Sequence, residues 1–277
     1  MSLNGPIAVL LDSGIFCHSE FGEGAAIQNA INWGGKNHVT TVHGVRRKAP
    51  NQKPGFQKQI EALPTIGRLI RENVIRAYEY MEIWCESMRF RPLLPFGNAL
   101  RDCTISKCDP PVDRSKFMQT ADVTEYFAKG GKKDRKRGVA TGTVSQIAFL
   151  KTLCGLGRES VDVLVPHSQM LRLTPFEIES LQNLSWFQFL CQRCGSAENY
   201  PDVFHLWTAE RNRLDVLLTL DNGLPELVSR VRREKKTTIE IKTQVLQPLE
   251  LLDRIGIKER DPVGLEAGRF YYLHELD

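Results

Sequence analysis

Short apolar runs alternate with longer amphipathic stretches along the chain. The runs at residues 7–11 (IAVLL), 161–165 (VDVLV) and 215–220 (DVLLTL) are mostly apolar, as in strands of a parallel sheet that is covered on both faces. Residues 238–243 (TIEIKT) predict a weaker strand nearer to an edge of the sheet. The pattern therefore predicts at least four strands.

Four stretches place apolar residues three and four positions apart, which predicts helices. They cover residues 56–73, 174–193, 202–213 and 225–236. Residues 74–90 (VIRAYEYMEIWCESMRF) begin like a strand and continue like a helix, so we expect a junction near Tyr80. Strands that alternate with helices predict an α/β fold, here three layers (α/β/α) around a central, mostly parallel sheet.

Residues 92–157 interrupt this regular pattern with proline, glycine and basic residues, and predict an insertion. A helical stretch at residues 144–156 indicates that the insertion is partly ordered. The 277 residues are 42% hydrophobic, which suffices for one large core. We expect a single domain over residues 5–257, followed by an extension over residues 258–277.

The charge balance is close to even, since Lys and Arg outnumber Asp and Glu by 37 to 33. This balance neither requires nor excludes a nucleic-acid partner, so any basic surface must come from local clustering. No apolar run approaches the roughly 20 residues of a membrane-spanning helix, and the N-terminal residues do not resemble a secretory leader. We therefore expect a cytoplasmic protein without a membrane partner.

The seven cysteines are scattered and odd in number, which is typical of reduced thiols. Only Cys191 and Cys194 form a CxxC pair. A structural zinc ion would need two further ligands, such as Cys103 and Cys108, brought close by the fold. A lone CxxC pair is a weak signal, and packing as small apolar side chains is the favoured interpretation.

Acidic residues follow two of the predicted strands. Asp12 comes directly after residues 7–11, Asp221 follows residues 215–220, and Asp202 opens the helix that precedes the second of these strands. Ligands of parallel sheets bind beyond the carboxyl ends of the strands, so the three acids are expected at one edge. Taken singly, Asp202 could be a helix N-cap, and Asp12 and Asp221 could be turn residues.

Three carboxylates at one place predict a metal site, because they repel one another unless a cation compensates their charge. An all-oxygen site with water suits Mg²⁺ or Mn²⁺. Such a cation lowers the pKa of a water molecule and neutralises charge on a phosphate, which is the chemistry of phosphodiester hydrolysis.

The segments around these acids resemble the PIN domains, a family of metal-dependent ribonucleases. The strand and acid at residues 8–16 (AVLLDSGIF) are similar to the family's first motif. Residues 201–228 are similar to its most specific motif, with Asp202 opening a helix, Ala209 facing inward, and Thr219 and Asp221 ending a strand. Residues 239–257 resemble the closing strand, proline and helix. The middle of the chain has no counterpart in the family.

The resemblance implies a fourth acid near the start of the helix after the second strand. It favours Glu82, with Glu86 one helical turn further on as the alternative, whereas Glu79 would lie in the strand. All three could instead be solvated surface acids. The implied ligands of one or two Mg²⁺ or Mn²⁺ ions are Asp12, Glu82, Asp202 and Asp221, supported by Ser13 and Thr219.

The resemblance implies cleavage of single-stranded RNA, and two basic runs could attract its phosphates. They are residues 129–138 (KGGKKDRKRG) and 229–236 (SRVRREKK), although solvated surface is an equally good interpretation of each. The first run supplies the predicted nucleic-acid contacts, namely Lys132, Lys133, Arg135, Lys136 and Arg137.

Other functions fit the same residues less well. A nuclease fold that has lost activity could serve as an RNA-binding or protein-interaction module, and metal titration would discriminate it. A toxin with an antitoxin partner is conceivable within the family, but the long insertion argues against it. A phosphatase with an aspartyl nucleophile would need an acid where Gly14 stands.

Overall fold

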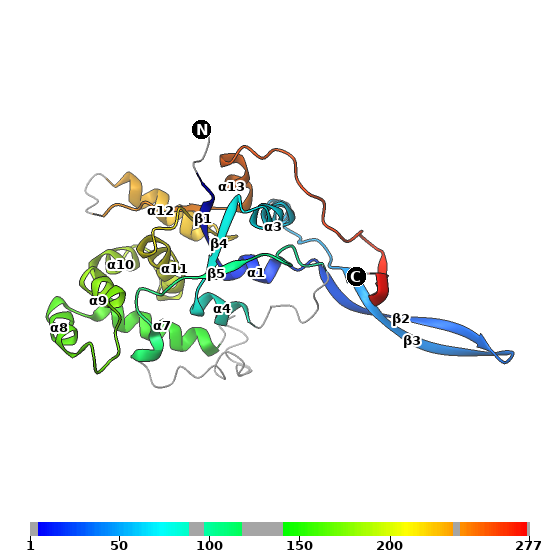
Figure 1. Cartoon of the computed structure of the whole chain (residues 1–277), viewed down its shortest axis with the longest axis horizontal. Helices are drawn as coiled ribbons and strands as arrows, with labels where there is room; N and C mark the ends of the chain where they lie inside the picture. The colour runs from blue at the N-terminus through cyan, green and yellow to red at the C-terminus, as the bar shows by residue number, and fades with distance from the viewer. Residues whose placement is uncertain (1–4, 89–96, 118–140, 235–238, 276–277) are drawn as a thin grey trace.

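A five-stranded parallel sheet organises the chain, with the strand order β5-β4-β1-β6-β7 (Figure 1). The computed structural model describes residues 5–88, 97–117, 141–234 and 239–275. The chain is an α/β protein, as expected. The strands are β1 (Ile7–Leu11), β4 (Ile75–Glu79), β5 (Ile105–Lys107), β6 (Val216–Leu218) and β7 (Gln244–Leu246).

The strand order reverses between β1 and β6. From β1 the chain continues to β4 and β5 on one side, and it then returns to β6 and β7 on the other side. Val9 pairs with Val216, and Leu11 pairs with Leu218, so the carboxyl ends of β1 and β6 lie next to each other. Ligand sites of open parallel sheets lie at such a reversal point.

The helices pack as two groups. The first contains α2 (Pro54–Ile60), α3 (Leu63–Arg71) and α13 (Pro248–Arg254), and α13 contacts both of the others. The second contains α7 (Thr141–Gly155), α9 (Pro175–Gln182), α10 (Leu184–Cys191) and α11 (Tyr200–Arg211). Phe187, Phe204 and Trp207 interlock at the centre of this second group, with rings 5.0 to 5.8 Å apart.

Most of the predicted elements are confirmed. The strand and helix boundaries predicted around Tyr80 agree with β4 and with α4 (Met81–Ser87), for which Tyr80 is the N-cap. The predicted helices at residues 225–236 and 202–213 correspond to α12 (Gly223–Arg233) and α11. Strands β1 and β6 lie where the apolar runs predicted them.

The strand predicted at residues 161–165 is wrong, because these residues belong to helix α8 (Arg158–Leu164) and the turn after it. Of this apolar run only Val161 is buried, and the side chain of Val163 is 64% exposed. Residues 161–165 therefore lie on the surface of the molecule, and they are not buried on both sides as the residues of a central strand would be.

The strand predicted at residues 238–243 is displaced, because the strand of the sheet is β7, which begins at Gln244. The backbone N–H groups of Lys242 and Thr243 donate to the carboxylate of Glu210 instead of to a neighbouring strand. Thr238 lies outside the described residues.

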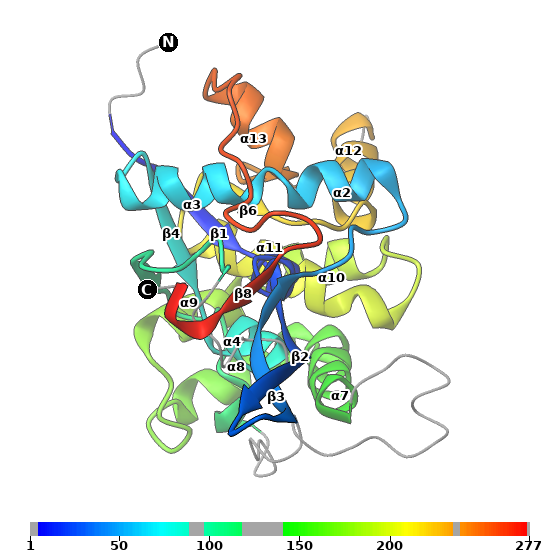
Figure 2. The same cartoon turned by 90° about the vertical axis from the view of Figure 1, so that its right-hand side faces the viewer.

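A long hairpin, which the hydrophobic pattern did not predict, extends away from the sheet (Figures 1 and 2). It consists of β2 (Gly22–Trp33) and β3 (Lys36–Arg47), and β8 (Phe270–Tyr272) pairs with the base of β3. Gly34 and Gly35 form its two-residue turn with φ of 60° and 77°, a backbone conformation that suits glycine. Both faces of its outer half are exposed to solvent.

The predicted insertion at residues 92–157 contributes to the fold in two places. Strand β5 pairs with β4 in the central sheet, and α7 packs against α10 and α11. The basic run at residues 129–138 lies outside the described residues. Among the helices that the structure describes, none is long and apolar enough to cross a membrane.

Candidate metal centre at the carboxyl edge of the sheet

Asp12 lies at the centre of a polar cluster, at the point where β1 ends and α1 (Ser13–His18) begins. One carboxylate oxygen, Oδ1, accepts a hydrogen bond of 2.7 Å from the backbone N–H of Ser13. The other, Oδ2, accepts a hydrogen bond of 2.7 Å from the hydroxyl of Thr219. Since Asp12 and Thr219 are 207 positions apart, the sheet register holds them together.

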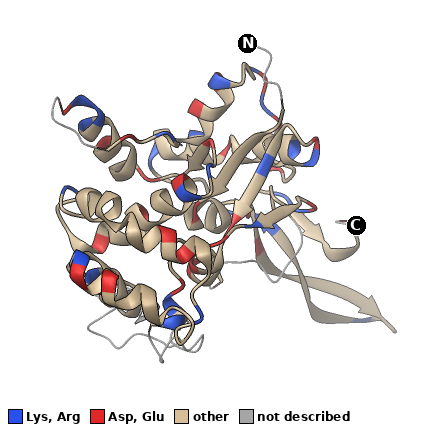
Figure 3. Ribbon diagram, turned by 60° about the vertical axis from the view of Figure 1, so that its left-hand side comes forward, with Lys and Arg blue, Asp and Glu red and all other residues tan. Residues whose placement is uncertain are grey.

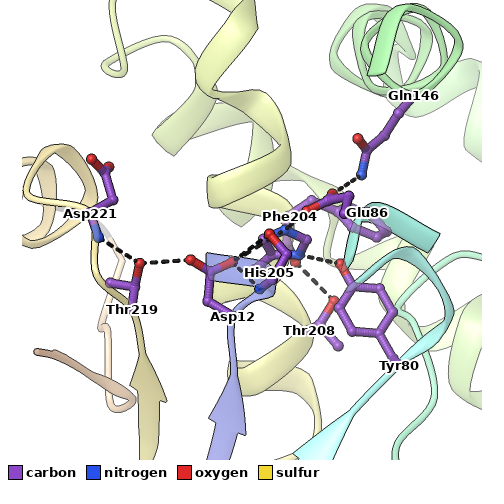
Figure 4. Close-up of polar contacts among 10 residues, drawn as sticks. Asp12, Tyr80, Glu86, Gln146, Phe204, His205, Thr208, Thr219 and Asp221 are labelled. Carbon is purple, nitrogen blue, oxygen red and sulfur yellow. Dashed lines mark hydrogen bonds and ion pairs between the residues drawn. The ribbon is translucent and has the colours of Figure 1, made fainter. Parts of the chain in front are cut away.

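Thr219 and Asp221 come from the end of β6, next to Asp12 (Figure 4). The hydroxyl oxygen of Thr219 accepts a hydrogen bond of 3.0 Å from the backbone N–H of Asp221. The carboxylate of Asp221 accepts a hydrogen bond of 3.0 Å from the backbone N–H of Gly223 and points away from Asp12. Thr219 therefore orients the carboxylate of Asp12 and the turn that carries Asp221.

Glu86 of α4 and His205 of α11 complete the cluster on the other side of Asp12. The Nε2 atom of His205 lies 3.2 Å from Oε2 of Glu86 and 4.0 Å from Oδ1 of Asp12. Oε1 of Glu86 accepts a hydrogen bond of 2.7 Å from the amide of Gln146 on α7. The Nδ1 atom of His205 lies 2.6 Å from the phenol oxygen of Tyr80.

The charges of this cluster shift the pKa values of its members. Burial alone would lower the pKa of His205, but the carboxylates of Glu86, Asp12 and Asp202 raise it to about 9. Burial would raise the pKa of Glu86, but His205 and hydrogen bonds lower it below its ordinary value. Burial raises the pKa of Asp12. In the absence of a metal ion, His205 is therefore a cation between two carboxylates.

Asp202, in the first turn of α11, is the least satisfied acid of the site. Burial, together with the negative charges of Asp12, Glu86 and Asp221, raises its pKa to about 7. Its carboxylate accepts no hydrogen bond from the part of the chain that the structure describes, and it caps no helix, because the N-cap of α11 is Asn199. A cation would compensate this charge.

The two candidates for the fourth acid lie in different surroundings. The carboxylate of Glu82 accepts a hydrogen bond of 2.9 Å from Arg114, and both side chains are buried. Glu86, one helical turn further on, faces His205 and shares the cluster with Asp12. The geometry therefore places Glu86, and not the favoured Glu82, within the cluster. Glu79 is buried within β4.

Asp12, Glu86 and His205 form the only group of three potential metal-ligating side chains found within the described ranges. One ligand atom of each lies within 4.8 Å of the other two. The sequence pattern did not single out His205, although it lies one helical turn after Asp202 and therefore on the same face of α11. The cysteines that a zinc site would need form no such group in the described ranges, where all seven cysteines are free thiols.

Two hollows flank Asp221 and give access to this edge of the sheet. One, of about 300 Å³, is lined by Asp202, Asp221 and Arg230. The other, of about 620 Å³, is lined by Lys53, Asn222 and other polar side chains. A larger hollow of about 730 Å³ includes Asp215 and lies at the amino ends of the strands, remote from the cluster.

The second basic run, at residues 229–236, partly serves the fold. Arg230 donates to the carbonyl of Arg193, and Arg232 donates to the carbonyls of Ile241 and Thr243. These hydrogen bonds connect α12 to neighbouring segments, so the two guanidinium groups are less available to contact phosphates.

Comparison with protein families, with curated proteins and with solved structures found no match to this chain. The resemblance to PIN domains therefore stays a prediction.

Proposed function

We propose that the protein is a divalent-metal-dependent nuclease that hydrolyses phosphodiester bonds in single-stranded RNA. The observation that carries the proposal is Asp202, whose pKa is raised by burial and by the charges of Asp12 and Glu86, and whose carboxylate accepts no hydrogen bond from the described residues. Carboxylates crowded in this way are stabilised by a bound cation. The choice of RNA rests on the resemblance to PIN domains.

The side chains present fit a divalent cation. Asp12 and Glu86, which belong to the cluster with His205, would hold it. Asp202 would join them, since the charges of Asp12, Glu86 and Asp221 already raise its pKa. A further sign is Gln146, whose buried Oε1 atom lacks a hydrogen-bond partner within the described residues, next to Glu86. When bound, a divalent cation supplies an activated water and neutralises charge on the phosphate.

The protein's own groups position this chemistry. Thr219 fixes the rotamer of Asp12, and Ser13 holds the other oxygen of the same carboxylate. A polynucleotide would lie in the two hollows beside Asp221, next to the acids. Lys53, which lines the hollow of about 620 Å³, would supply a positive charge for its phosphates.

We extend the proposal to the fold, which we interpret as a three-layer PIN-like domain over residues 5–257 with an insertion at residues 92–157. The separation of the two helix groups on the two sides of the strands in Figures 1 and 2 supports it. The closing strand β7, Pro248 and helix α13 also follow the order of elements in that family.

The test combines metal binding with cleavage. Mn²⁺ should raise the unfolding temperature of the chelator-treated protein by mass action, and the loaded protein should cut a mixed-sequence single-stranded RNA. Asp12→Asn and Asp202→Asn should abolish both effects, whereas Asp253→Asn, at an exposed position of α13, should abolish neither. Metal-independent cleavage, or full cleavage by Asp202→Asn, would refute the proposal.

A second candidate is a nuclease-like module without activity that binds RNA or a protein. It is favoured by the raised pKa of His205, because an imidazolium between Asp12 and Glu86 neutralises part of the cluster without any metal. A protein whose unfolding temperature does not respond to Mn²⁺ or Mg²⁺ would support this candidate over the nuclease.

A further inference from the structure

His205 is a buried side chain whose two ring nitrogens have different surroundings. Its side chain is 2% exposed, and α11 directs the ring between Tyr80 and the acids (Figure 4). Nδ1 faces the phenol of Tyr80, and Nε2 faces Glu86 and Asp12. Which nitrogen keeps a proton is decided by these partners.

A neutral imidazole that binds a metal ion through Nε2 must carry its proton on Nδ1. Nδ1 of His205 lies 2.6 Å from the phenol oxygen of Tyr80, which can accept from Nδ1–H in this tautomer. A cation at Nε2 would fix this tautomer. A neutral imidazole held in this way carries its lone pair on Nε2.

Each of the two acids directs one carboxylate oxygen toward Nε2. Gln146 donates to Oε1 of Glu86, and Oε2 of Glu86 faces His205. Thr219 donates to Oδ2 of Asp12, and Oδ1, which also accepts from the backbone N–H of Ser13, faces His205. Nε2 of His205 lies 3.2 Å from Oε2 of Glu86 and 4.0 Å from Oδ1 of Asp12, and both distances are within the about 4.2 Å that two metal–ligand bonds of about 2.1 Å can span.

We infer that Nε2 of His205 is a ligand of the cation, and that this site therefore selects a transition metal such as Mn²⁺ over Mg²⁺. The inference rests on the proposed metal centre and specifies its cofactor. Imidazole suits transition metals, whereas Mg²⁺ is held by oxygen ligands and water. Tyr80 is the positioning residue that orients the ring and fixes its tautomer, as partners of metal-bound histidines commonly do.

Electron spin-echo spectroscopy of the Mn²⁺-loaded full chain tests the inference directly. Wild-type protein should show modulation from a directly bound ¹⁴N nucleus, and labelling histidine with ¹⁵N should change that modulation. His205→Gln should remove the modulation, while the matched control His167→Gln, at an exposed position in the turn that follows α8, should retain it.

Affinities measured by competition provide the second readout. We expect Mn²⁺ to bind wild-type protein at least tenfold more tightly than Mg²⁺, and His205→Gln to reduce this ratio to near one. Tyr80→Phe removes the acceptor of Nδ1–H and should weaken Mn²⁺ binding about tenfold, with a smaller effect on Mg²⁺.

The outcomes separate this inference from the proposed function. Bound Mn²⁺ without nitrogen modulation in the wild-type protein would overturn the role of His205 and leave the nuclease proposal standing. Nitrogen modulation in a protein that cleaves no RNA would support the inference and refute the nuclease. Failure of Mn²⁺ to bind would overturn both. The spectrum of the wild-type protein alone decides whether His205 binds the metal ion, even if a variant does not fold.

Discussion

At the scale of single residues, two raised pKa values predict how the metal-free protein responds to pH. His205 has a folded pKa of about 9 against an ordinary 6.5, and Asp202 has about 7 against 3.8. Both groups therefore bind protons more tightly in the folded state than in the unfolded state. The stability that His205 contributes is lost between about pH 6.5 and 9, and that of Asp202 between about pH 4 and 7.

We therefore expect the chelator-treated protein to be less stable at pH 9 than at pH 6, as measured by urea unfolding. Each pKa unit corresponds to about 1.4 kcal/mol. In Asp202→Asn the acid is always neutral, so this variant should be more stable than wild-type protein at pH 8 without metal. A metal-free stability that rises between pH 6 and 9 would contradict both pKa shifts.

A second prediction separates the two glutamates of α4. Glu82→Gln removes the negative charge that pairs with the buried guanidinium of Arg114, so it should lower the free energy of unfolding by on the order of 3 kcal/mol. Metal affinity should remain close to the wild-type value. Glu86→Gln should do the reverse, with at least a tenfold loss of metal affinity.

Urea unfolding and Mn²⁺ titration of the two purified variants measure these effects. The pair is well matched, because the residues lie on one helix, one turn apart, and carry the same substitution. If Glu82→Gln abolished metal binding while Glu86→Gln preserved it, the fourth ligand would be Glu82, as the resemblance to PIN domains first indicated.

At the scale of elements, the sequence predicted the parts of the fold that are buried on two sides. Strands β1 and β6 are fully apolar and lie within the sheet, so their pattern was unambiguous. The run at residues 161–165 has a similar composition, but its burial depends on distant neighbours that the local pattern does not reveal. The pattern also indicated acids at the edge of the sheet, but it could not distinguish Glu82 from Glu86. Their partners, Arg114 and His205, come from distant parts of the chain.

His205 and the hairpin escaped prediction for different physical reasons. A histidine on a helix is usually a packed core residue, and only the approach of Asp12 and Glu86 in the folded chain makes His205 a candidate ligand. The outer halves of strands β2 and β3 are exposed on both faces, so they lack the alternation of apolar and polar residues that marks a half-buried strand. The turn of Gly34 and Gly35 was the remaining local signal.

The hairpin gives a prediction at this scale. Replacing residues 27–42 by Asn-Gly would join Ala26 to His43 with a two-residue turn and keep the base of the hairpin with β8. Because the removed residues are exposed or half-buried and contact little of the core, we expect the unfolding temperature to change by less than about 4 °C. Metal affinity should not change.

Thermal unfolding and Mn²⁺ titration of the shortened chain check this expectation. A large loss of stability would mean that the outer hairpin packs on the core in solution. Loss of metal binding would mean that the hairpin supports the site, which the contacts of Asp12, Glu86 and His205 do not indicate.

At the scale of the whole molecule, charge and topology are arranged around one edge of the sheet. The strand order reverses between β1 and β6, and the candidate ligands come from β1, α4 and α11, which are far apart in sequence. Figure 3 shows that the hairpin ribbon is nearly uncharged, and Lys36 is the only Lys, Arg, Asp or Glu among residues 24–45. Attraction of a polynucleotide must therefore come from other parts of the surface.

The basic run at residues 129–138 is the strongest concentration of positive charge in the sequence, and the last prediction concerns its role. Each phosphate contact that it provides should contribute about −0.7 to the slope of log affinity against log salt concentration for single-stranded RNA. Replacing its five predicted contact residues by Ala should therefore flatten the slope by up to about 3.5. The residues are Lys132, Lys133, Arg135, Lys136 and Arg137.

Binding of a labelled single-stranded RNA to catalytically silenced Asp12→Asn protein, titrated between 50 and about 300 mM salt, measures this slope without cleavage. The matched control replaces Arg230, Arg232 and Arg233 of α12 by Ala. Because Arg230 and Arg232 already donate to backbone carbonyls, this control should change the slope less. An unchanged slope in the first variant, with a flattened slope in the second, would place RNA binding on α12 rather than on residues 129–138.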